Sequence, residues 1–156
     1  LNPYPNFFID DREIKKNQSD LKPSYTIETL QSLAIEKKEG QAFCFLMGSD
    51  AFLNLESWHL WDELFNYCHI LIVERRESPI LADQLTSALK KEWGERLTQD
   101  VEDLRGSSHG LIMAKQFDYI DISSSQIRDA IYSNKNLKGL LPQELADYIN
   151  LNKLYR

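Results

Sequence analysis

Three serines and an arginine, Ser123, Ser124, Ser125 and Arg128, stand where an apolar, strand-like run gives way to an amphipathic, helix-like run. The first N–H groups of a helix have no partner within the helix, and the helix dipole makes that end positive. A cation near the first turn opposes this dipole unless an anion offsets it, and phosphate suits both a helix N-terminus and an arginine. The pattern favours a phosphate site, with a helix cap and a solvated arginine as the alternative.

The stretch FLMGSDAF is a second strand-to-helix junction whose residues could bind a ligand. Gly48 directly follows an apolar run, and a residue without Cβ lets a ligand come close to the backbone. Asp50 would then offer a fixed carboxylate to the hydroxyl groups of a sugar. The alternative is that Ser49 or Asp50 caps the helix that follows.

A third junction carries two tryptophans. The stretch ESWHLWDEL places Trp58 and Trp61 three residues apart, so that they share a face if the helix is regular. Core packing is the simpler interpretation for both side chains. Trp58 lies nearer the junction, where its indole could stack on a flat heteroaromatic ring, and the spacing alone does not decide between the two.

The elements that must position these residues alternate between strand and helix. Apolar runs predict strands from Asn6 and over 41–48, 69–75 and 110–122, with a polar loop over 15–23. The continuous apolar runs over 41–48 and 69–75 favour strands that are buried on both faces of a parallel sheet. Helical spacing and stop signals predict helices over 24–40, 49–68, 78–97, 123–134 and 141–156. This alternation predicts an α/β fold with a mostly parallel, Rossmann-like sheet, formed by a single domain over residues 1–156. In such sheets ligands bind beyond the carboxyl ends of the strands.

Composition narrows the classes of function. The 156 residues are 42% hydrophobic and 27% charged, with a net charge of −6, which is typical of a globular protein and argues against a nucleic-acid surface. No apolar run approaches the ~18 residues of a membrane span, and the start of the chain does not resemble a signal peptide. We therefore expect a cytoplasmic protein without a membrane or nucleic-acid partner. The histidines and cysteines show no ligand spacing, so no metal site is predicted.

Five segments in order resemble the bacterial nicotinate mononucleotide adenylyltransferases, of the HxGH-type nucleotidyltransferase superfamily. These segments are DREIKK…PSYTIETL, FLMGSDAFLNLESWHLWDELF, HILIVERRE, ISSSQIRDAI and LLPQELADYINLNKLYR. The resemblance implies a Rossmann-like nucleotidyltransferase fold and the transfer of an adenylyl group from ATP to nicotinate mononucleotide. Deamido-NAD and pyrophosphate would be the products of this step in NAD biosynthesis, with Mg²⁺ assisting. The partners would be these small molecules, and homo-oligomerisation is left open.

The resemblance also implies roles for particular residues. On the mononucleotide side it implies Tyr25, Thr26, Asp50, Trp58 and His59, with Trp58 stacked on the pyridine ring and Thr26 and the His59 N–H at the ring carboxylate. On the ATP side it implies Gly48, Asp50, Arg75, Ile122, Ser123, Ser124 and Arg128. Ser124 and Arg128 would act catalytically by stabilising phosphate charge, since the reaction needs no protein nucleophile.

One family signature is not found in this chain. In the family, a G-G-[TS]-F-x-P-x-H-x-G-H segment follows the first strand. The portion of the family that would precede the strand expected from Asn6 amounts to roughly two βα units, on the order of 60 residues. The chain thus reads as the carboxyl-terminal two-thirds of such an enzyme. Three hypotheses are compatible with this: a piece of an active adenylyltransferase, a catalytically inactive nucleotide-binding module, or an adenylyltransferase for another small molecule.

Overall fold

The computed structural model describes residues 5–20, 23–75, 79–117 and 122–155, without the side chains of residues 17–20 and of Arg75. The chain divides into two compact units, Leu1–Asp118 and Tyr119–Arg156. Each unit has its own hydrophobic core and is described by itself below. The single-domain organisation stays a prediction.

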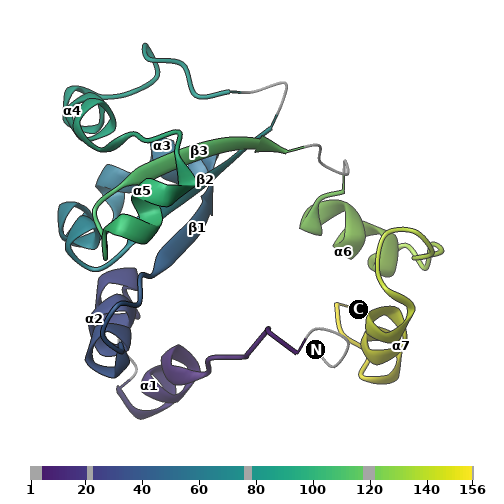
Figure 1. Ribbon diagram of the computed structural model, residues 1–156. Helices are drawn as coiled ribbons and strands as arrows, with labels where there is room; N and C mark the ends of the chain where they lie inside the picture. The colour runs from purple at the N-terminus through teal and green to yellow at the C-terminus, as the bar shows by residue number, and fades with distance from the viewer. Residues whose placement is uncertain (1–4, 21–22, 76–78, 118–121, 156) are drawn as a thin grey trace. The chain divides into compact units, whose positions relative to one another are not determined.

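A parallel sheet of three strands forms the centre of the first unit (Figure 1). Its strands are β1 (Cys44–Gly48), β2 (His69–Arg75) and β3 (Ile112–Phe117), and they lie in the order β1-β2-β3. The predicted α/β class is therefore confirmed. All three carboxyl ends lie at one edge of the sheet, because both pairings are parallel.

The helices of the first unit flank these strands in the chain. They are α1 (Arg12–Asp20), α2 (Thr26–Glu36), α3 (Ser49–Leu53), α4 (Ser87–Arg96) and α5 (Val101–Gly106), with the 3₁₀ helices η1 (Leu55–Ser57) and η2 (Trp61–Asn66). The core joins α2 and α3 to the sheet: Ile27 of α2 and Phe52 of α3 are buried together with Ile70 and Ile72 of β2. No helix within the described ranges is long and apolar enough to cross a membrane.

The second unit consists of two short helices and the turns between them. Helix α6 (Ser124–Tyr132) and helix α7 (Gln143–Leu151) bury a small core of Ala130, Ile131, Leu137, Ala146 and Ile149. Both helices were expected from the spacing of their apolar residues, and both are confirmed.

The prediction of a strand from Asn6 is wrong. Residues 6–11 form no regular element, and Phe7, Phe8 and Ile9 are exposed. The polar residues expected to form a loop over 15–23 instead belong largely to α1, which begins at Arg12. An apolar run becomes a strand only where a neighbouring strand can pair with it, and the sequence pattern carries no information about that neighbour.

The prediction that β1 is buried on both faces is also wrong. β1 is an edge strand among the described residues, and Cys44 and Leu46 are exposed while Met47 is buried. The central strand β2 matches the expectation, because Ile70 and Ile72 are both fully buried.

The single helix predicted over 49–68 is replaced by three short elements. Helix α3 ends at Leu53, and η1 and η2 are separated by a turn in which Leu60 adopts the left-handed conformation, with φ of 50°. Trp58 has an extended backbone with ψ of 144°, so Trp58 and Trp61 do not share a helix face. The helix predicted over 78–97 likewise begins only at Ser87, after Thr86 as its N-cap.

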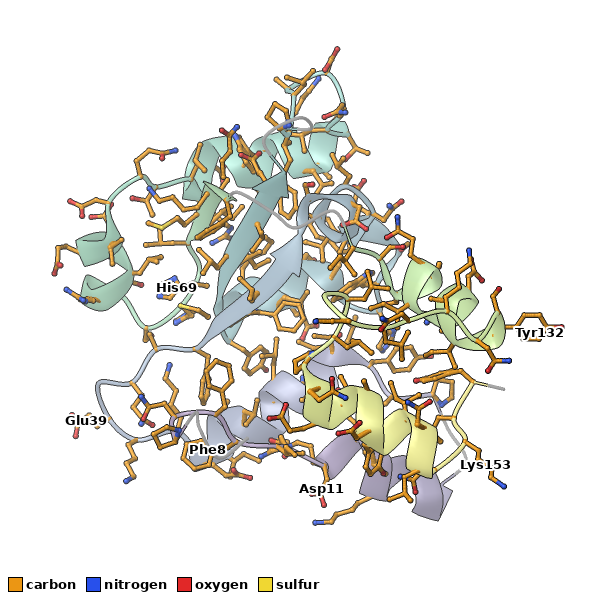
Figure 2. The ribbon with its side chains drawn as sticks, turned by 90° about the vertical axis from the view of Figure 1, so that its right-hand side faces the viewer. Phe8, Asp11, Glu39, His69, Tyr132 and Lys153 are labelled. Carbon is orange, nitrogen blue, oxygen red and sulfur yellow. The ribbon has the colours of Figure 1, made fainter. Side chains whose placement is uncertain are left out.

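A buried histidine fixes the loop that precedes β3. His69 lies at the start of β2 (Figure 2) and is fully buried. Its Nδ1 accepts a hydrogen bond from the Leu111 N–H at 3.1 Å. Its Nε2 lies 3.0 Å from the carbonyl oxygen of Ser107. Because one partner can only donate and the other can only accept, the imidazole is neutral with its proton on Nε2. His69 is therefore a structural residue.

Replacement of His69 by phenylalanine should destabilise the protein by about 1–3 kcal/mol, because the Leu111 N–H and the Ser107 carbonyl would lose their partner inside the protein. Urea denaturation followed by circular dichroism measures this change. The matched control is His109→Phe, at an exposed position, which should change the unfolding free energy by less than about 0.5 kcal/mol. Equal losses in the two variants would contradict the assignment.

Candidate functional site

Gly48 and Asp50 lie where β1 ends and α3 begins. Gly48 is the N-cap residue of α3, so the alternative that Ser49 or Asp50 caps this helix is wrong. A Cβ built on Gly48 would lie 2.5 Å from Oδ1 of Asp50. The missing side chain thus makes room for the carboxylate of Asp50, which is exposed in the first turn of α3 at the carboxyl edge of the sheet.

Arg75 ends β2 at the same edge, paired in register with Phe117 of β3. Its side chain lies outside the described part of the chain, so its predicted contact with ATP stays a prediction. The preceding residue, Glu74, is almost completely buried, and its Oε1 accepts a hydrogen bond of 2.8 Å from the N–H of Ile80. Glu74 thereby ties Ile80 to the end of the strand.

Four of the residues expected around the mononucleotide meet in one cavity of about 230 Å³. Tyr25 and Thr26 come from the start of α2, and Trp58 and His59 come from the turn between η1 and η2. Ser24 and Ser57, which precede these two pairs, complete the lining. The rings of Tyr25 and His59 lie 4.4 Å apart at a tilt of 39°. Asp50, the fifth residue expected there, is not among the residues that line this cavity.

The indole of Trp58 packs against the core and also lines this cavity. Its ring meets Phe45 of β1 edge-on, with 6.0 Å between centroids and 82° between planes. It is only partly buried, and it lines the cavity. Trp61 packs edge-on against Phe65 instead and does not line that cavity. Both indoles are partly buried against the core, and the two tryptophans differ in that Trp58 lines this cavity while Trp61 does not.

The start of α2 gives the cavity its electrostatic character. Thr26 is the first residue of the helix, and the positive end of the helix dipole lies at this terminus. A carboxylate is stabilised there by the backbone N–H groups of the first turn. The hydroxyl of Thr26 and these N–H groups together suit a flat ring that carries a carboxylate.

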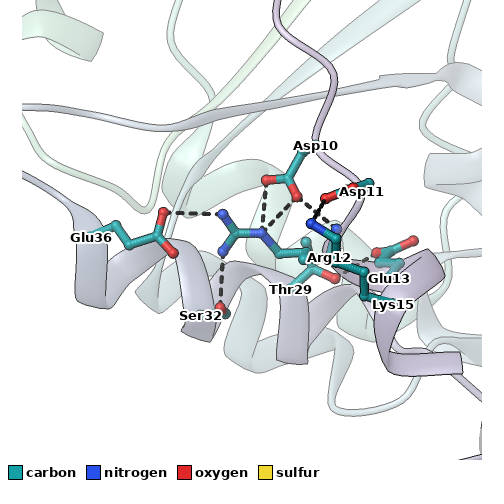
Figure 3. Close-up of polar contacts among 8 residues, drawn as sticks. All are labelled: Asp10, Asp11, Arg12, Glu13, Lys15, Thr29, Ser32 and Glu36. Carbon is teal, nitrogen blue, oxygen red and sulfur yellow. Dashed lines mark hydrogen bonds and ion pairs between the residues drawn. The ribbon is translucent and has the colours of Figure 1, made fainter. Parts of the chain in front are cut away.

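Helix α1 supports α2 through a network of polar contacts that was not expected from the sequence (Figure 3). Arg12 donates to Asp10, to Oγ of Ser32 at 2.9 Å and to Oε2 of Glu36 at 3.1 Å. The hydrogen bonds from Arg12 lower the pKa of Asp10 below its ordinary value. Thr29 of α2 donates in turn to Glu13 of α1 at 2.5 Å. These contacts fix α1 along α2.

The three serines and the arginine lie at the start of α6 in the second unit. Ser123 is the N-cap: its Oγ accepts from the Gln126 N–H at 3.1 Å, and the Gln126 side chain accepts from the Ser123 N–H at 2.6 Å. This reciprocal capping box leaves the hydroxyl protons of Ser123 and Ser124 to face an acceptor. Ile122 precedes the cap and is half-buried.

Arg128 lies just beyond the first turn of α6, but its guanidinium reaches back toward the helix N-terminus. Its Nη2 lies 3.3 Å from Oγ of Ser125. Arg128 and Ser124 line a cavity of about 380 Å³ together with side chains of α7 and the C-terminal turn, among them Tyr148 and Tyr155. Both the arginine and the serines are exposed, as expected for groups that would receive an anion.

Comparison with known proteins places these features in a family. The model of the cytidylyltransferase-like family matches residues 4–130. The chain belongs to this family. Among curated relatives, it is 33% identical to a probable nicotinate-nucleotide adenylyltransferase of Pseudomonas syringae pv. tomato over 95% of this chain and 63% of the relative. It is 34% identical to the protein of the same name from Yersinia pestis, over 97% of this chain and 66% of the relative. The resemblance found in the sequence is thereby confirmed.

Solved structures share the fold. A nicotinic acid mononucleotide adenylyltransferase of Plasmodium falciparum, complexed with NaAD, superposes with a TM-score of 0.57 at 18% identity. The match covers 85% of this chain and 58% of that one. The chain spans about two thirds of the length of the curated relatives that it matches.

Proposed function

We propose that the chain is part of a nicotinate-nucleotide adenylyltransferase, which joins ATP and nicotinate mononucleotide to give deamido-NAD and pyrophosphate. The observation that carries this proposal is the cavity in which Tyr25, Thr26, Trp58 and His59 meet. Its residues come from two segments of the chain, with 31 positions from Thr26 in the first to Ser57 in the second. Both segments resemble segments of the family. The curated relatives with this activity in their names support the same reaction.

The cavity would select the ring of the mononucleotide. Trp58 stacks on the pyridine ring, while the Thr26 hydroxyl and the N–H groups of Thr26 and His59 donate to its carboxylate. Tyr25 closes the other side through its contact with the His59 ring. The nicotinamide form would turn an NH₂ group toward these donors and leave them unpaired, a costly mismatch inside a cavity. The cavity would therefore bind nicotinate mononucleotide more tightly than nicotinamide mononucleotide.

The start of α6 would hold the phosphates of ATP. Ser123 and Ser124 donate hydroxyl hydrogen bonds there, and Arg128 adds a guanidinium that can bind two phosphate oxygens at once. Ile122 positions the cap. At the sheet edge, Gly48 and Asp50 serve the nucleotides, with Asp50 on sugar hydroxyls and Arg75 toward the adenine.

The reaction needs positioning and charge stabilisation. A phosphate oxygen of the mononucleotide attacks the α-phosphorus of ATP, the bond from that phosphorus to the oxygen that bridges to the β-phosphate breaks, and pyrophosphate leaves with the electron pair. Ser124 and Arg128 stabilise the charge that develops on the phosphates. Mg²⁺ would be bound by the phosphates of ATP and would neutralise part of their charge. We expect the proposed enzyme to act in the cytoplasm, where its substrate ATP is available.

The complete gene product that contains this chain should release pyrophosphate from ATP with nicotinate mononucleotide, and at least about tenfold more slowly with nicotinamide mononucleotide, because the amide leaves buried donors unpaired. A coupled pyrophosphate assay with each mononucleotide measures both rates. Equal rates would overturn the acid preference. Binding of the mononucleotide without turnover would favour an inactive binding module, and turnover only with another phosphorylated acceptor would favour a different adenylyltransferase.

Trp58→Ala should weaken the binding of nicotinate mononucleotide by about 1–3 kcal/mol, because the stacked face is lost. The matched control is Trp61→Ala, which removes an equally partly buried indole that packs against Phe65 and does not line the cavity. Both variants should lower the thermal unfolding temperature, and only Trp58→Ala should change the dissociation constant in isothermal titration calorimetry. Loss of binding in both, or in neither, would contradict the stacking role.

Arg128→Gln should raise the KM for ATP and lower kcat by about tenfold or more, because the charge that meets the phosphates is lost. The KM for nicotinate mononucleotide should change little. Arg105→Gln, at an exposed arginine near the end of α5, is the control and should leave all three constants unchanged. Equal effects of the two substitutions would remove Arg128 from the active site.

A further inference from the structure

Glu28 occupies the third position of α2, within the same helix end as the mononucleotide cavity. Its Oε2 accepts a hydrogen bond from the Tyr25 N–H at 3.3 Å, which is one half of a capping box. The same oxygen lies 2.6 Å from Nζ of Lys16 of α1. The hydrogen bonds from Lys16 and from the Tyr25 N–H hold the pKa of Glu28 below its ordinary value, so this side chain is a carboxylate anion.

A carboxylate at this place conflicts with a ligand that brings another one. Both anions use the N-terminal end of α2, and like charges in one site raise the free energy of binding. Glu28 and Lys16 line a hollow that shares Ser24 with the mononucleotide cavity, so the two sites are neighbours. An uncompensated Glu28 would therefore repel the ring carboxylate of nicotinate mononucleotide, but not the neutral amide of nicotinamide mononucleotide.

Lys16 is placed to remove this conflict. It contacts Glu28 from α1, and α1 is held on α2 by the contacts of Arg12 and Glu13. His59 also interacts electrostatically with Glu28. The other acidic side chain of the hollow that Glu28 and Lys16 line is Glu13, which accepts a hydrogen bond from the hydroxyl of Thr29.

We propose that Lys16 is a specificity-determining residue: it neutralises Glu28, so that Glu28 can order the start of α2 without repelling a ligand carboxylate. This inference rests on the proposed function. Lys16 does not touch the ligand in this role, and it acts through the charge of Glu28.

The experiment compares two probes, nicotinate mononucleotide and nicotinamide mononucleotide, by isothermal titration calorimetry on the complete protein at low ionic strength. Lys16→Met should weaken binding of the acid by about two- to fivefold, the range typical of one partly exposed charge pair, and leave binding of the amide unchanged. The effect should shrink in about 1 M salt, where the Debye length is about 3 Å. Lys15→Met, which removes an exposed lysine that pairs with Asp11, is the matched control and should change neither.

A second substitution separates charge from structure. Glu28→Gln keeps a side-chain oxygen for the Tyr25 N–H and removes the negative charge. The double variant Lys16→Met with Glu28→Gln should therefore regain the affinity of the wild type for the acid. If Lys16→Met weakens both mononucleotides equally, or if Glu28→Gln does not restore the acid, Lys16 has only a structural role and the proposal is overturned.

The outcome for the unsubstituted protein tests the proposed function independently. Wild-type protein that binds the two mononucleotides equally, or neither, contradicts the proposed function itself. Wild-type protein that prefers the acid while Lys16→Met leaves that preference intact contradicts only the role of Lys16.

Discussion

Several of the groups proposed to meet a ligand in this chain lie at the start of a helix, where backbone N–H groups have no partner within the helix. Thr26 begins α2, Gly48 caps α3 with Asp50 in its first turn, and Ser123 caps α6. Phosphate and carboxylate are anions, and a helix start supplies them with donors and a positive dipole without a buried cation. The chain carries a net charge of −6, so such local donors, and not its overall charge, are what can hold anionic substrates.

The same constraint governs the chain's own carboxylates. Helix starts attract Asp and Glu side chains as readily as ligands, and here Asp50 folds over Gly48 while Glu28 turns back to Tyr25. Each such side chain stabilises its helix, and at the same time it competes with an anionic substrate for the N–H groups at the helix start. Local stability and anion binding are thus coupled, and a neighbouring cation such as Lys16 adjusts the balance between them.

The sequence predicted best what depends on local pattern. The buried strand β2, the helices α6 and α7 and a cap among the three serines follow from runs and spacings that lie within a few residues, although the pattern did not single out Ser123 as the cap. It failed where distant partners decide: the apolar residues after Asn6 find no neighbouring strand in the described chain, and β1 has an exposed side because it lies at an edge. The cavity around Trp58 was expected only from family resemblance, and the pairing of Lys16 with Glu28, 12 residues apart, left no periodic signal.

Leu60 shows how the cavity obtains its shape. A left-handed conformation costs a residue with a Cβ roughly 1–2 kcal/mol, and the turn at Leu60 is what orients Trp58 and His59. The buried side chains on either side, Leu55 and Leu64, hold this turn in place. The hydrophobic core therefore preorganises the wall of the cavity, and the ligand proposed for it would meet side chains that are already ordered.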